Sequence, residues 1–469
     1  MNRPVDPAKV PPAAVAAEVG KAKADFDALL GENPKISFID AVMADLCGVL
    51  RGKRMPLAEA GKLFTSGMQI PLSIYLMDAK GEMANPMGRG FGDGDPDGTA
   101  WPIPGTATRV WGSDPPRGQI LMAFRDDAGS AFAGEPRAAL ARVAKRFEGL
   151  GLTPVTAVEL EFYLIDEKRD AAGRPQPPLC PRTGARERAV SVYSVDDLDR
   201  YQGFVTALNE AAVVERVPVS ATSSEYAPGQ FEANLKHQNN ALHAADHAIL
   251  LRQIVMAAAV SQHCHATFMA KPYADRAGSG QHVHLSLLDK TGRNVFNNGT
   301  PEGSEMLRFA AGGCAALMPE SMAIFAPSLN SYRRFAPDMF APVNRRWGVN
   351  NRSAGLRVPV GPQDARRIEH RVAGADANPY LVLAAVLAGV HHGIINKLDP
   401  GPPAVGNVSR EPDLSLPFSL DDALMRLEQA KVLPDYFSAE TLTLYRETKR
   451  IEQQRLRKQI TDAEYEWYL

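Results

Sequence analysis

Four segments in the second half of the chain alternate between apolar residues and residues that carry charges or bind metals. The segments are 155–164, 230–235, 281–288 and 366–372. The alternation predicts four strands, because successive side chains of a strand point to opposite faces of a sheet. Their polar faces carry glutamate, histidine and arginine, whereas a solvated face usually mixes Thr, Lys, Ser and Gln. This pattern constrains the fold most, because a buried face of this kind must be given partners for its charges.

The polar faces bring carboxylates and an imidazole to one side of the predicted sheet. Glu159 and Glu161 lie about 7 Å apart along their strand. The whole set comprises Glu159, Glu161, Glu225, Glu232, His282 and Glu369. Burying these carboxylates without cations would be very costly. We therefore predict bound divalent metal, and an oxygen-rich set with one imidazole favours Mg²⁺ or Mn²⁺ over zinc. The alternative is a set of half-exposed strands with solvated polar faces.

Arginine dominates the positive charge between residues 333 and 371. This stretch holds nine arginines and no lysine. Both residue types serve on a solvated surface, whereas the planar guanidinium suits bidentate binding of carboxylate or phosphate. Metal carboxylates beside such arginines are typical of phosphoryl transfer, in which cations bridge the phosphates and arginines neutralise developing charge. The alternative is a network of surface ion pairs.

The remaining composition excludes several classes of protein. With 469 residues the chain is long enough for two or three domains of about 150 residues each. A net charge of −2 argues against nucleic acid or an anionic membrane as a partner. Four scattered cysteines without a C-x-x-C pair exclude a disulfide scaffold and a zinc finger. No signal-peptide stretch occurs, and the aliphatic run 380–390 is too short to span a membrane. We expect a soluble cytoplasmic protein.

Composition along the chain suggests an arm, a small domain and a larger one. Residues 1–12 hold four prolines and are predicted to be a loose arm, followed by a helix over 13–30 that ends at Gly31. A strand over 35–42 precedes a turn from Asp45 to Gly48 and a second short strand. No Rossmann or P-loop motif occurs. The predicted divisions are 1–33, 34–132 and 133–469.

At these residues the chain resembles the glutamine synthetase family, from about residue 35 to the C-terminus. Six motifs stand in the order that the family shows, which is far more specific than any single short pattern. They are Glu159-Leu-Glu161-Phe162, Glu225 with 228–232, Lys271-Pro272 with 278–284, 351–359, 367–371 and Asn378-Pro379-Tyr380. The resemblance implies an α+β fold, with an N-terminal β-grasp domain and a catalytic α/β domain built on a curved antiparallel sheet.

The resemblance also implies two metal sites in each subunit. It assigns Glu161, Glu225 and Glu232 to a metal near the glutamate substrate. It assigns Glu159, His282 and Glu369 to a second metal, which bridges the phosphates of ATP. The implied cofactors are therefore two or more Mg²⁺ or Mn²⁺ ions, with ATP as co-substrate.

Substrate contacts follow from the same resemblance. The residues implied for glutamate are Gly278, Arg334, Arg371 and, from a looser match, Tyr193. The residues implied for ATP and the transferred phosphate are Arg352, Arg357, Arg367, His284 and Ser286, of which Arg352 and Arg357 are expected to be catalytic. Asp45 matches the acidic residue that takes a proton from the incoming nitrogen in the active site of a neighbouring subunit. The implied assembly is a homo-oligomer, a dodecamer of two stacked hexamers.

Two departures from the family pattern point to a different nucleophile. Glutamine synthetases proper carry a glutamate before Ala-Pro on the flap that guards ammonium, and Phe340 stands there in this chain. Ala277 replaces the asparagine that usually precedes Gly-Ser-Gly, which puts one glutamate contact in doubt. The segments 45–54 and 464–469 resemble the γ-glutamylpolyamine synthetase branch.

We therefore expect an ATP-dependent ligase that joins glutamate to an amine. A diamine such as putrescine is the first candidate for this amine, and a monoamine is the second. Phe340 would pack the alkyl chain and attract a distal ammonium, for which Asp338 is a further candidate. The alternatives are an ordinary ammonia-dependent glutamine synthetase and a catalytically inactive relative. The second is disfavoured because all six metal ligands are present.

Overall fold

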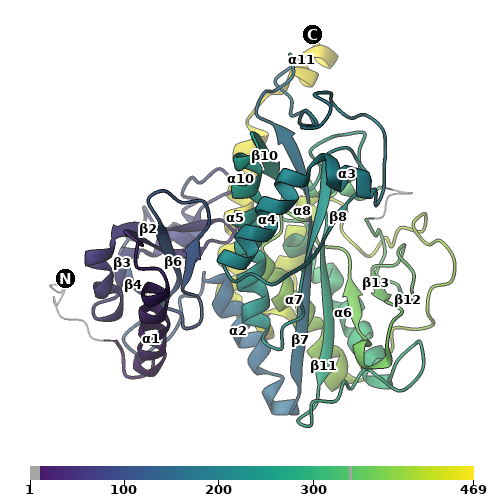
Figure 1. Cartoon of the computed structure of the whole chain (residues 1–469). Helices are drawn as coiled ribbons and strands as arrows, with labels where there is room; N and C mark the ends of the chain where they lie inside the picture. Colours follow the sequence, from purple (N-terminus) through teal and green to yellow (C-terminus); the bar gives the residue numbers. More distant parts are fainter. Residues whose placement is uncertain (1–10, 337–340) are drawn as a thin grey trace.

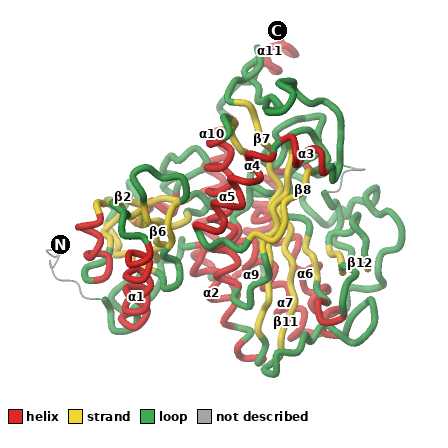
Figure 2. Tube along the Cα trace, in the orientation of Figure 1, coloured by secondary structure: helices red, strands yellow, loops and turns green. Residues whose placement is uncertain are grey.

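The structure is a computed structural model that describes residues 11–336 and 341–469 (Figure 1). Its strands form two separate sheets, one in the N-terminal part and one in the larger remainder, with helices beside both (Figure 2). Most of the predicted N-terminal arm lies outside the described residues, as do Asp338 and Phe340. The two sheets with their helices confirm the α+β class.

The smaller sheet has the strand order β2-β1-β6-β4-β3, and β5 also pairs with β6. Strands β1 and β6 run parallel, and the other pairs are antiparallel. The strands are β1 (Phe38–Ala44), β2 (Leu50–Pro56), β3 (Met68–Pro71), β4 (Asp97–Pro102), β5 (Thr108–Val110) and β6 (Arg117–Phe124).

The larger sheet has the order β12-β13-β14-β11-β7-β9-β8, and β10 also pairs with β7. All pairs are antiparallel except β12 with β13. The strands are β7 (Thr153–Asp166), β8 (Val219–Ser224), β9 (Gln230–Leu235), β10 (Cys264–Thr267), β11 (Gln281–Leu288), β12 (Trp347–Val349), β13 (Leu356–Val358) and β14 (Ile368–His370). Strands β9 and β11 have the predicted bounds, whereas β14 is shorter than the predicted 366–372.

Helices pack against both sheets. The α-helices are α1 (Ala16–Glu32), α2 (Pro136–Lys145), α3 (Val195–Arg200), α4 (Gln202–Val214), α5 (Ala241–Ser261), α6 (Glu305–Phe325), α7 (Pro379–Asn396), α8 (Leu420–Glu428), α9 (Leu433–Phe437), α10 (Ala439–Arg457) and α11 (Asp462–Tyr468). The 3₁₀ helices are η1 (Leu57–Phe64), η2 (Leu72–Leu76), η3 (Pro86–Gly88), η4 (Glu148–Leu150), η5 (Ser331–Arg334) and η6 (Gln363–Ala365).

The apolar face of β7 explains why the helices pack there. Val158, Leu160, Phe162 and Leu164 are all fully buried and belong to one large hydrophobic core. Helix α5 contacts β7, β9 and β10, and α6 and α7 lie against each other in the same core. Because alternate residues of a strand point to opposite faces, burial of this face presents Glu159 and Glu161 on the other side.

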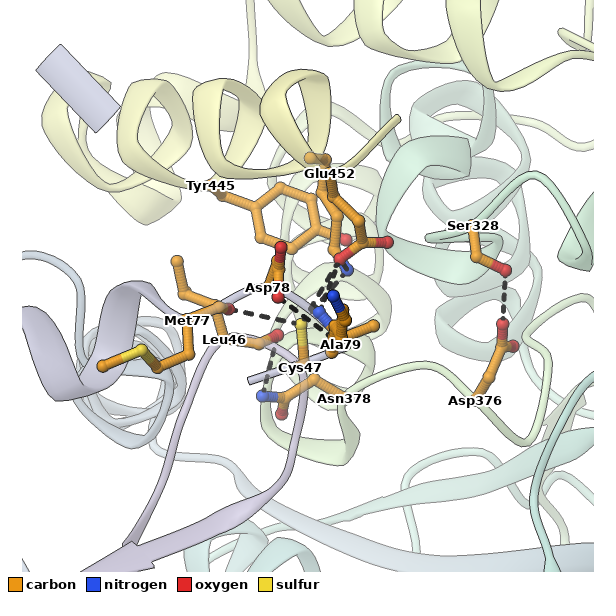
Figure 3. A network of polar contacts seen from close by, with 12 residues as sticks. Leu46, Cys47, Met77, Asp78, Ala79, Ser328, Asp376, Asn378, Tyr445 and Glu452 are labelled. Atoms are coloured by element: carbon orange, nitrogen blue, oxygen red, sulfur yellow. Dashed lines mark hydrogen bonds and ion pairs between the residues drawn. The ribbon is translucent and has the colours of Figure 1, made fainter. Parts of the chain in front are cut away.

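Helix α10 ties the C-terminal region to the N-terminal part. Glu452 accepts a hydrogen bond from the backbone N–H of Ala79 at 2.9 Å (Figure 3). Lys449 Nζ lies 3.3 Å from the Cys47 sulfur. Arg455 pairs with Asp78. These contacts join residues more than 370 positions apart and fix the turn that follows β1.

The first helix ends differently from the prediction. Helix α1 continues through Gly31 to Glu32, and Asn33 caps it. The Asn33 side-chain amide donates to the Leu29 carbonyl at 3.0 Å, and its backbone N–H bonds the same carbonyl. An asparagine that satisfies the last carbonyls removes the need for a terminating glycine.

Two helices, α5 and α7, are long and apolar enough to cross a membrane by length and composition alone. The aliphatic run predicted as too short is thus part of an 18-residue helix. In the apolar windows of α5 and α7, 67% and 83% of the residues are buried inside the structure. That burial is the pattern of helices in a protein core.

A buried glutamate between the N-terminal part and the larger part predicts how the stability of the fold depends on pH. Glu215, at the end of α4, is buried and accepts a hydrogen bond from the Trp111 N–H at 3.1 Å. Burial raises the pKa of Glu215 to about 7, against the partial opposition of that hydrogen bond. Its contribution to stability is therefore present below its unfolded pKa and is lost as pH rises through about 7.

We predict that Glu215→Gln raises the melting temperature at pH 8.5 but changes it little at pH 5, because an amide does not ionise. Each unit of pKa corresponds to about 1.4 kcal/mol of unfolding free energy. Thermal unfolding of both proteins at the two pH values tests this. Glu210→Gln, at an exposed position of the same helix, is the matched control and should show no pH-dependent difference. Equal gains for Glu215→Gln at both pH values would contradict the prediction.

Candidate metal and substrate site

Strand pairing brings the predicted ligands together on one face of the larger sheet. His282 on β11 lies opposite Glu159 on β7, and Glu161 lies opposite Glu232 on β9. On the other side of β11, His284 lies opposite Glu369 on β14. Residues opposite each other in antiparallel strands have Cβ atoms about 5 Å apart. Four strands that are distant in sequence thus build one cluster of charged side chains.

Glu159, His282 and Glu369 form the first potential metal group. Each offers a ligand atom, and these atoms lie within 4.8 Å of one another. His282 Nδ1 is 3.3 Å from Glu159 Oε2 and 3.9 Å from Glu369 Oε1. The three residues are those that the sequence assigns to the second metal.

The second group contains Glu161, Glu232 and again His282, whose ligand atoms also lie within 4.8 Å of one another. Glu161 is oriented by the Gly280 N–H, which donates to its Oε2 at 2.7 Å. Asn234 donates to Glu232 Oε1 at 3.1 Å. Glu225, predicted for this metal, lies outside the group but close enough for its charge to interact with that of Glu161.

Charge is balanced unevenly across this cluster. Burial opposes ionisation of Glu369, but the charges of Arg371 and the two histidines outweigh it and bring its pKa to about 2. At Glu232, burial and repulsion from neighbouring carboxylates raise the pKa well above its ordinary value. Burial and the charge of Glu161 likewise raise the pKa of Glu225 to about 8. Near Glu225 and Glu232, burial and carboxylate repulsion therefore outweigh the positive charge that Arg352 supplies.

These residues fit a divalent cation. Carboxylate oxygens with one imidazole are the donors that Mg²⁺ and Mn²⁺ accept, and no cysteine contributes to either group. A cation among Glu161, Glu225 and Glu232 would relieve the repulsion that raises the pKa values of Glu225 and Glu232.

The arginines predicted as one constellation divide into two sets. Arg357 Nη1 lies 2.7 Å from Glu369 Oε2, Arg371 pairs with the same carboxylate, and Arg367 Nε donates to His284 Nδ1 at 2.9 Å. In contrast, Arg345 and Arg346 pair with Asp413 and Glu411 on a loop outside the cluster. For this second set, the alternative of surface ion pairs is correct.

Arg334 and Gly278 pack against each other beside the cluster. A Cβ at Gly278 would lie 2.6 Å from Arg334 Cγ and 2.8 Å from the Ala270 carbonyl, so only glycine fits. Arg334 is buried, and its Nη1 donates to the Val372 carbonyl at 3.1 Å. Its guanidinium thus lies next to the segment that carries Arg371.

Arg352 and Tyr193 lie on the Glu225 side of the site. Burial raises the pKa of Tyr193, with a further rise from the charge of Glu225 and an opposing effect of Arg352. The ring is nevertheless 57% exposed, which places it at the rim. Ser286 lies on β11, two residues beyond His284 and on the same face.

Asp45 lies in the turn after β1 and is fully buried within its own chain. Its Oδ1 accepts from the N–H groups of Cys47 and Val49 at 2.9 Å, and its Oδ2 pairs with Arg51 at 2.9 Å. These bonds give Asp45 a structural role in the turn. Its role as proton acceptor stays a prediction.

His237 is a residue near this site that the sequence did not reveal. Its ring lies 6.1 Å from that of His284, edge to face. Burial, with the charges of His284 and Arg367, lowers the pKa of His237 to about 4. The residue lies two positions beyond the end of β9, where strand alternation no longer predicts which way a side chain points.

We predict that Glu161→Ala and Glu369→Ala each weaken Mn²⁺ binding by at least about tenfold, since even residues that only orient metal ligands have effects of that size. Calorimetric titration with Mn²⁺, or the paramagnetic resonance of free Mn²⁺, measures the change. Glu59→Ala, at an exposed glutamate of η1 that pairs with Lys62, is the matched control. Unchanged Mn²⁺ affinity in Glu161→Ala would contradict the assignment.

Comparison with known proteins identifies the family. The model of the glutamine synthetase catalytic domain matches residues 133–468. A γ-glutamylputrescine synthetase of Escherichia coli (strain K12) is 40% identical over 93% of this chain and 92% of its own length. A glutamate–isopropylamine ligase of a Pseudomonas species is 32% identical over 89% of this chain and 92% of its own. A solved structure of GmaS with ADP is similar with a TM-score of 0.81 and 28% identity, covering 95% of this chain and 99% of that one. The chain therefore belongs to the glutamine synthetase family.

Proposed function

We propose that this protein is an ATP-dependent ligase that joins the γ-carboxylate of glutamate, through γ-glutamyl phosphate, to an amine. The observation that carries the proposal is the pair of three-ligand groups beside Arg357 and Arg371, which is the arrangement that phosphoryl transfer requires. The amine is supported by relatives named for putrescine and isopropylamine. A polyamine such as putrescine is the first candidate for the amine substrate, and a monoamine is the second.

The roles of the charged residues follow from their positions. Glu159, His282 and Glu369 would hold one Mg²⁺ or Mn²⁺ ion, and Glu161, Glu232 and Glu225 a second, which supply neutralising charge at the phosphates. Gly278, Arg334 and Arg371, with Tyr193 at the rim, would bind glutamate.

The arginines and β11 would serve the nucleotide and the transferred group. His284, Ser286 and Arg367 would contact ATP, and the bond from Arg367 to His284 fixes the orientation of both side chains. Arg352 and Arg357 would stabilise negative charge on the phosphoryl group as it moves, because preorganised donors need no rearrangement during the reaction.

Deprotonation of the amine is the remaining requirement. An alkylamine has a pKa near about 10.4, so roughly one molecule in 2,500 is neutral at pH 7 and deprotonation costs about 4.6 kcal/mol. A carboxylate placed beside the nitrogen offsets part of that cost. We assign this role to Asp45, acting in the active site of a neighbouring subunit in a homo-oligomer. Because its carboxylate is fully buried in the single chain, the role requires the turn from Asp45 to Gly48 to open in the assembly.

The proposed assembly is a dodecamer of two stacked hexamers, and the proposed location is the cytoplasm. Several aromatic side chains near the C-terminus support an assembly, since Trp467 and Tyr468 are 76% and 79% exposed in the single chain. The cysteines support the location, because Cys47, Cys180, Cys264 and Cys314 are all free thiols. We also propose a domain division near residue 133, between the end of β6 and the start of α2.

We predict that catalytic efficiency with the best amine exceeds that with ammonium by roughly tenfold or more, the ~1.4 kcal/mol available from chain packing and a cation–π contact. Release of ADP in the presence of glutamate, Mg²⁺ and a panel of amines or ammonium measures this. Phe340→Glu should narrow the difference, because it restores the acidic residue of ammonia-using relatives. If ammonium is the best nucleophile, the protein is an ordinary glutamine synthetase and the amine proposal is wrong.

We predict partial recovery of activity when Asp45→Ala and Arg334→Ala proteins are mixed under conditions of subunit exchange. A mixed assembly contains some sites with an intact Asp45 from one chain and an intact Arg334 from the next. Exchange is followed independently with fluorescently labelled subunits, and each variant mixed with itself is the control. Absence of recovery after complete exchange would mean that one chain builds the whole site.

A further inference from the structure

Arg252 is a buried cation in an otherwise apolar stretch of helix α5. Its side chain is 8% exposed and its guanidinium stacks over the Phe268 ring, 5.6 Å from the centroid. Among residues 11–336 and 341–469, no carboxylate forms an ion pair with it. Burying an unpaired charge is costly, so a guanidinium retained here must satisfy other polar groups.

Arg252 contacts two backbone carbonyls of the segment that follows β14 and the side-chain oxygen of Gln281 in β11. Its Nη2 donates to the Ala375 carbonyl at 2.6 Å and also to the Ala377 carbonyl. The same nitrogen lies 3.3 Å from Gln281 Oε1. The chain leaves the sheet after β14, so these buried carbonyls have no strand partner and need another donor.

The residues that Arg252 contacts belong to the two segments that carry Gly278 and Arg371, which are proposed to bind glutamate. Gln281 follows Gly278 by three residues, and Ala375 follows Arg371 by four. The segments pair with each other, since the Gln281 N–H donates to the Ala373 carbonyl at 2.8 Å and the Ala375 N–H donates to the Ser279 carbonyl at 3.0 Å. One guanidinium therefore contacts both of the paired segments.

The turn that contains Asp45 lies against the same guanidinium. A Cβ on Gly48 would lie 3.0 Å from Arg252 Nη1, so the backbone of the turn approaches the charge closely. Asn378, one residue after Ala377, donates to the Asp45 carbonyl at 2.8 Å. It also donates to the Leu46 carbonyl at 3.3 Å (Figure 3). The stretch from Ala375 to Asn378 thus connects Arg252 with the turn.

We propose that Arg252 is a positioning residue for the glutamate site, acting through the backbone of Ala375 and Ala377 and the side chain of Gln281. The inference rests on the proposed function, because it assigns glutamate to the segments that Arg252 supports. Arg252 reaches neither the carboxylate cluster nor any arginine of that site. All three acceptors are contacted by one nitrogen, Nη2, which lies one bond farther from the backbone than the Nζ of a lysine, so a lysine ammonium does not reach the same position.

The test is Arg252→Lys, which keeps the charge and withdraws the donor nitrogen from the three acceptors. We expect the KM for glutamate and its calorimetric Kd to rise roughly tenfold, the effect of losing one charge-assisted hydrogen bond. The KM for ATP should change less than about twofold. The matched control is Arg137→Lys, because Arg137 is also largely buried and binds Asp246 on the same helix α5 at 2.9 and 3.0 Å.

Arg137→Lys should lower the melting temperature without changing the affinity for glutamate. The same result for Arg252→Lys, a lower melting temperature with unchanged glutamate KM and Kd, would overturn the inference. If Arg252→Lys does not fold, Gln281→Met decides, because it removes one acceptor and keeps a similar volume. A rise in glutamate Kd in that variant supports the inference, and an unchanged Kd overturns it.

The inference and the proposed function fail in different ways. Absence of ligation by the unmodified protein with every amine and with ammonium would contradict the proposed function. Ligation by the unmodified protein with unaltered glutamate binding in the Arg252 and Gln281 variants would contradict only the positioning role.

Discussion

The concentration of negative charge on one face of a β-sheet is the constraint on which this structure depends. Antiparallel pairing places ligand atoms of Glu159 and Glu369, and likewise of Glu161 and Glu232, within 4.8 Å of each other and of His282, and pairing cannot be changed without losing the sheet. Arg357 and Arg371 neutralise the Glu369 side of this face. On the opposite side, burial and carboxylate repulsion outweigh the charge of Arg352 and favour the protonated form of Glu232, which is why the site fits divalent cations.

The opposite face of the same sheet provides the rigidity that a charged cluster needs. The alternate residues of β7 enter a core shared with α5, α6 and α7, so the strand cannot shift to relieve repulsion among its glutamates. Close approach of backbone at Gly278 then lets Arg334 lie next to the cluster. Packing on one side and charge on the other are thus two consequences of a single alternation.

The edges of the site are held by elements far away in sequence. Arg252 in α5 binds the segment after Arg371, and Asn378 joins that segment to the turn of Asp45. Helix α10 contacts the other side of the same turn, where Glu452 and Lys449 both lie against the Cys47 sulfur. The N-terminal part is therefore attached to the larger part at the point where the proposed proton acceptor lies.

Local periodicity in the sequence determined the bounds of β9 and β11, the presence of β7 and the face on which the metal-ligating residues lie, because side-chain alternation is a property of the strand itself. Motifs in their order indicated the family. Only the tertiary structure decided which arginines reach the cluster, since Arg345 and Arg346 turn to a loop while Arg357 and Arg371 turn inward. It also decided that His282 serves both metal groups and that Arg252, in a helix of apolar appearance, binds three distant acceptors. Periodicity specifies the face of a residue but not its partner, because the partner depends on the register and packing of segments that are remote in sequence.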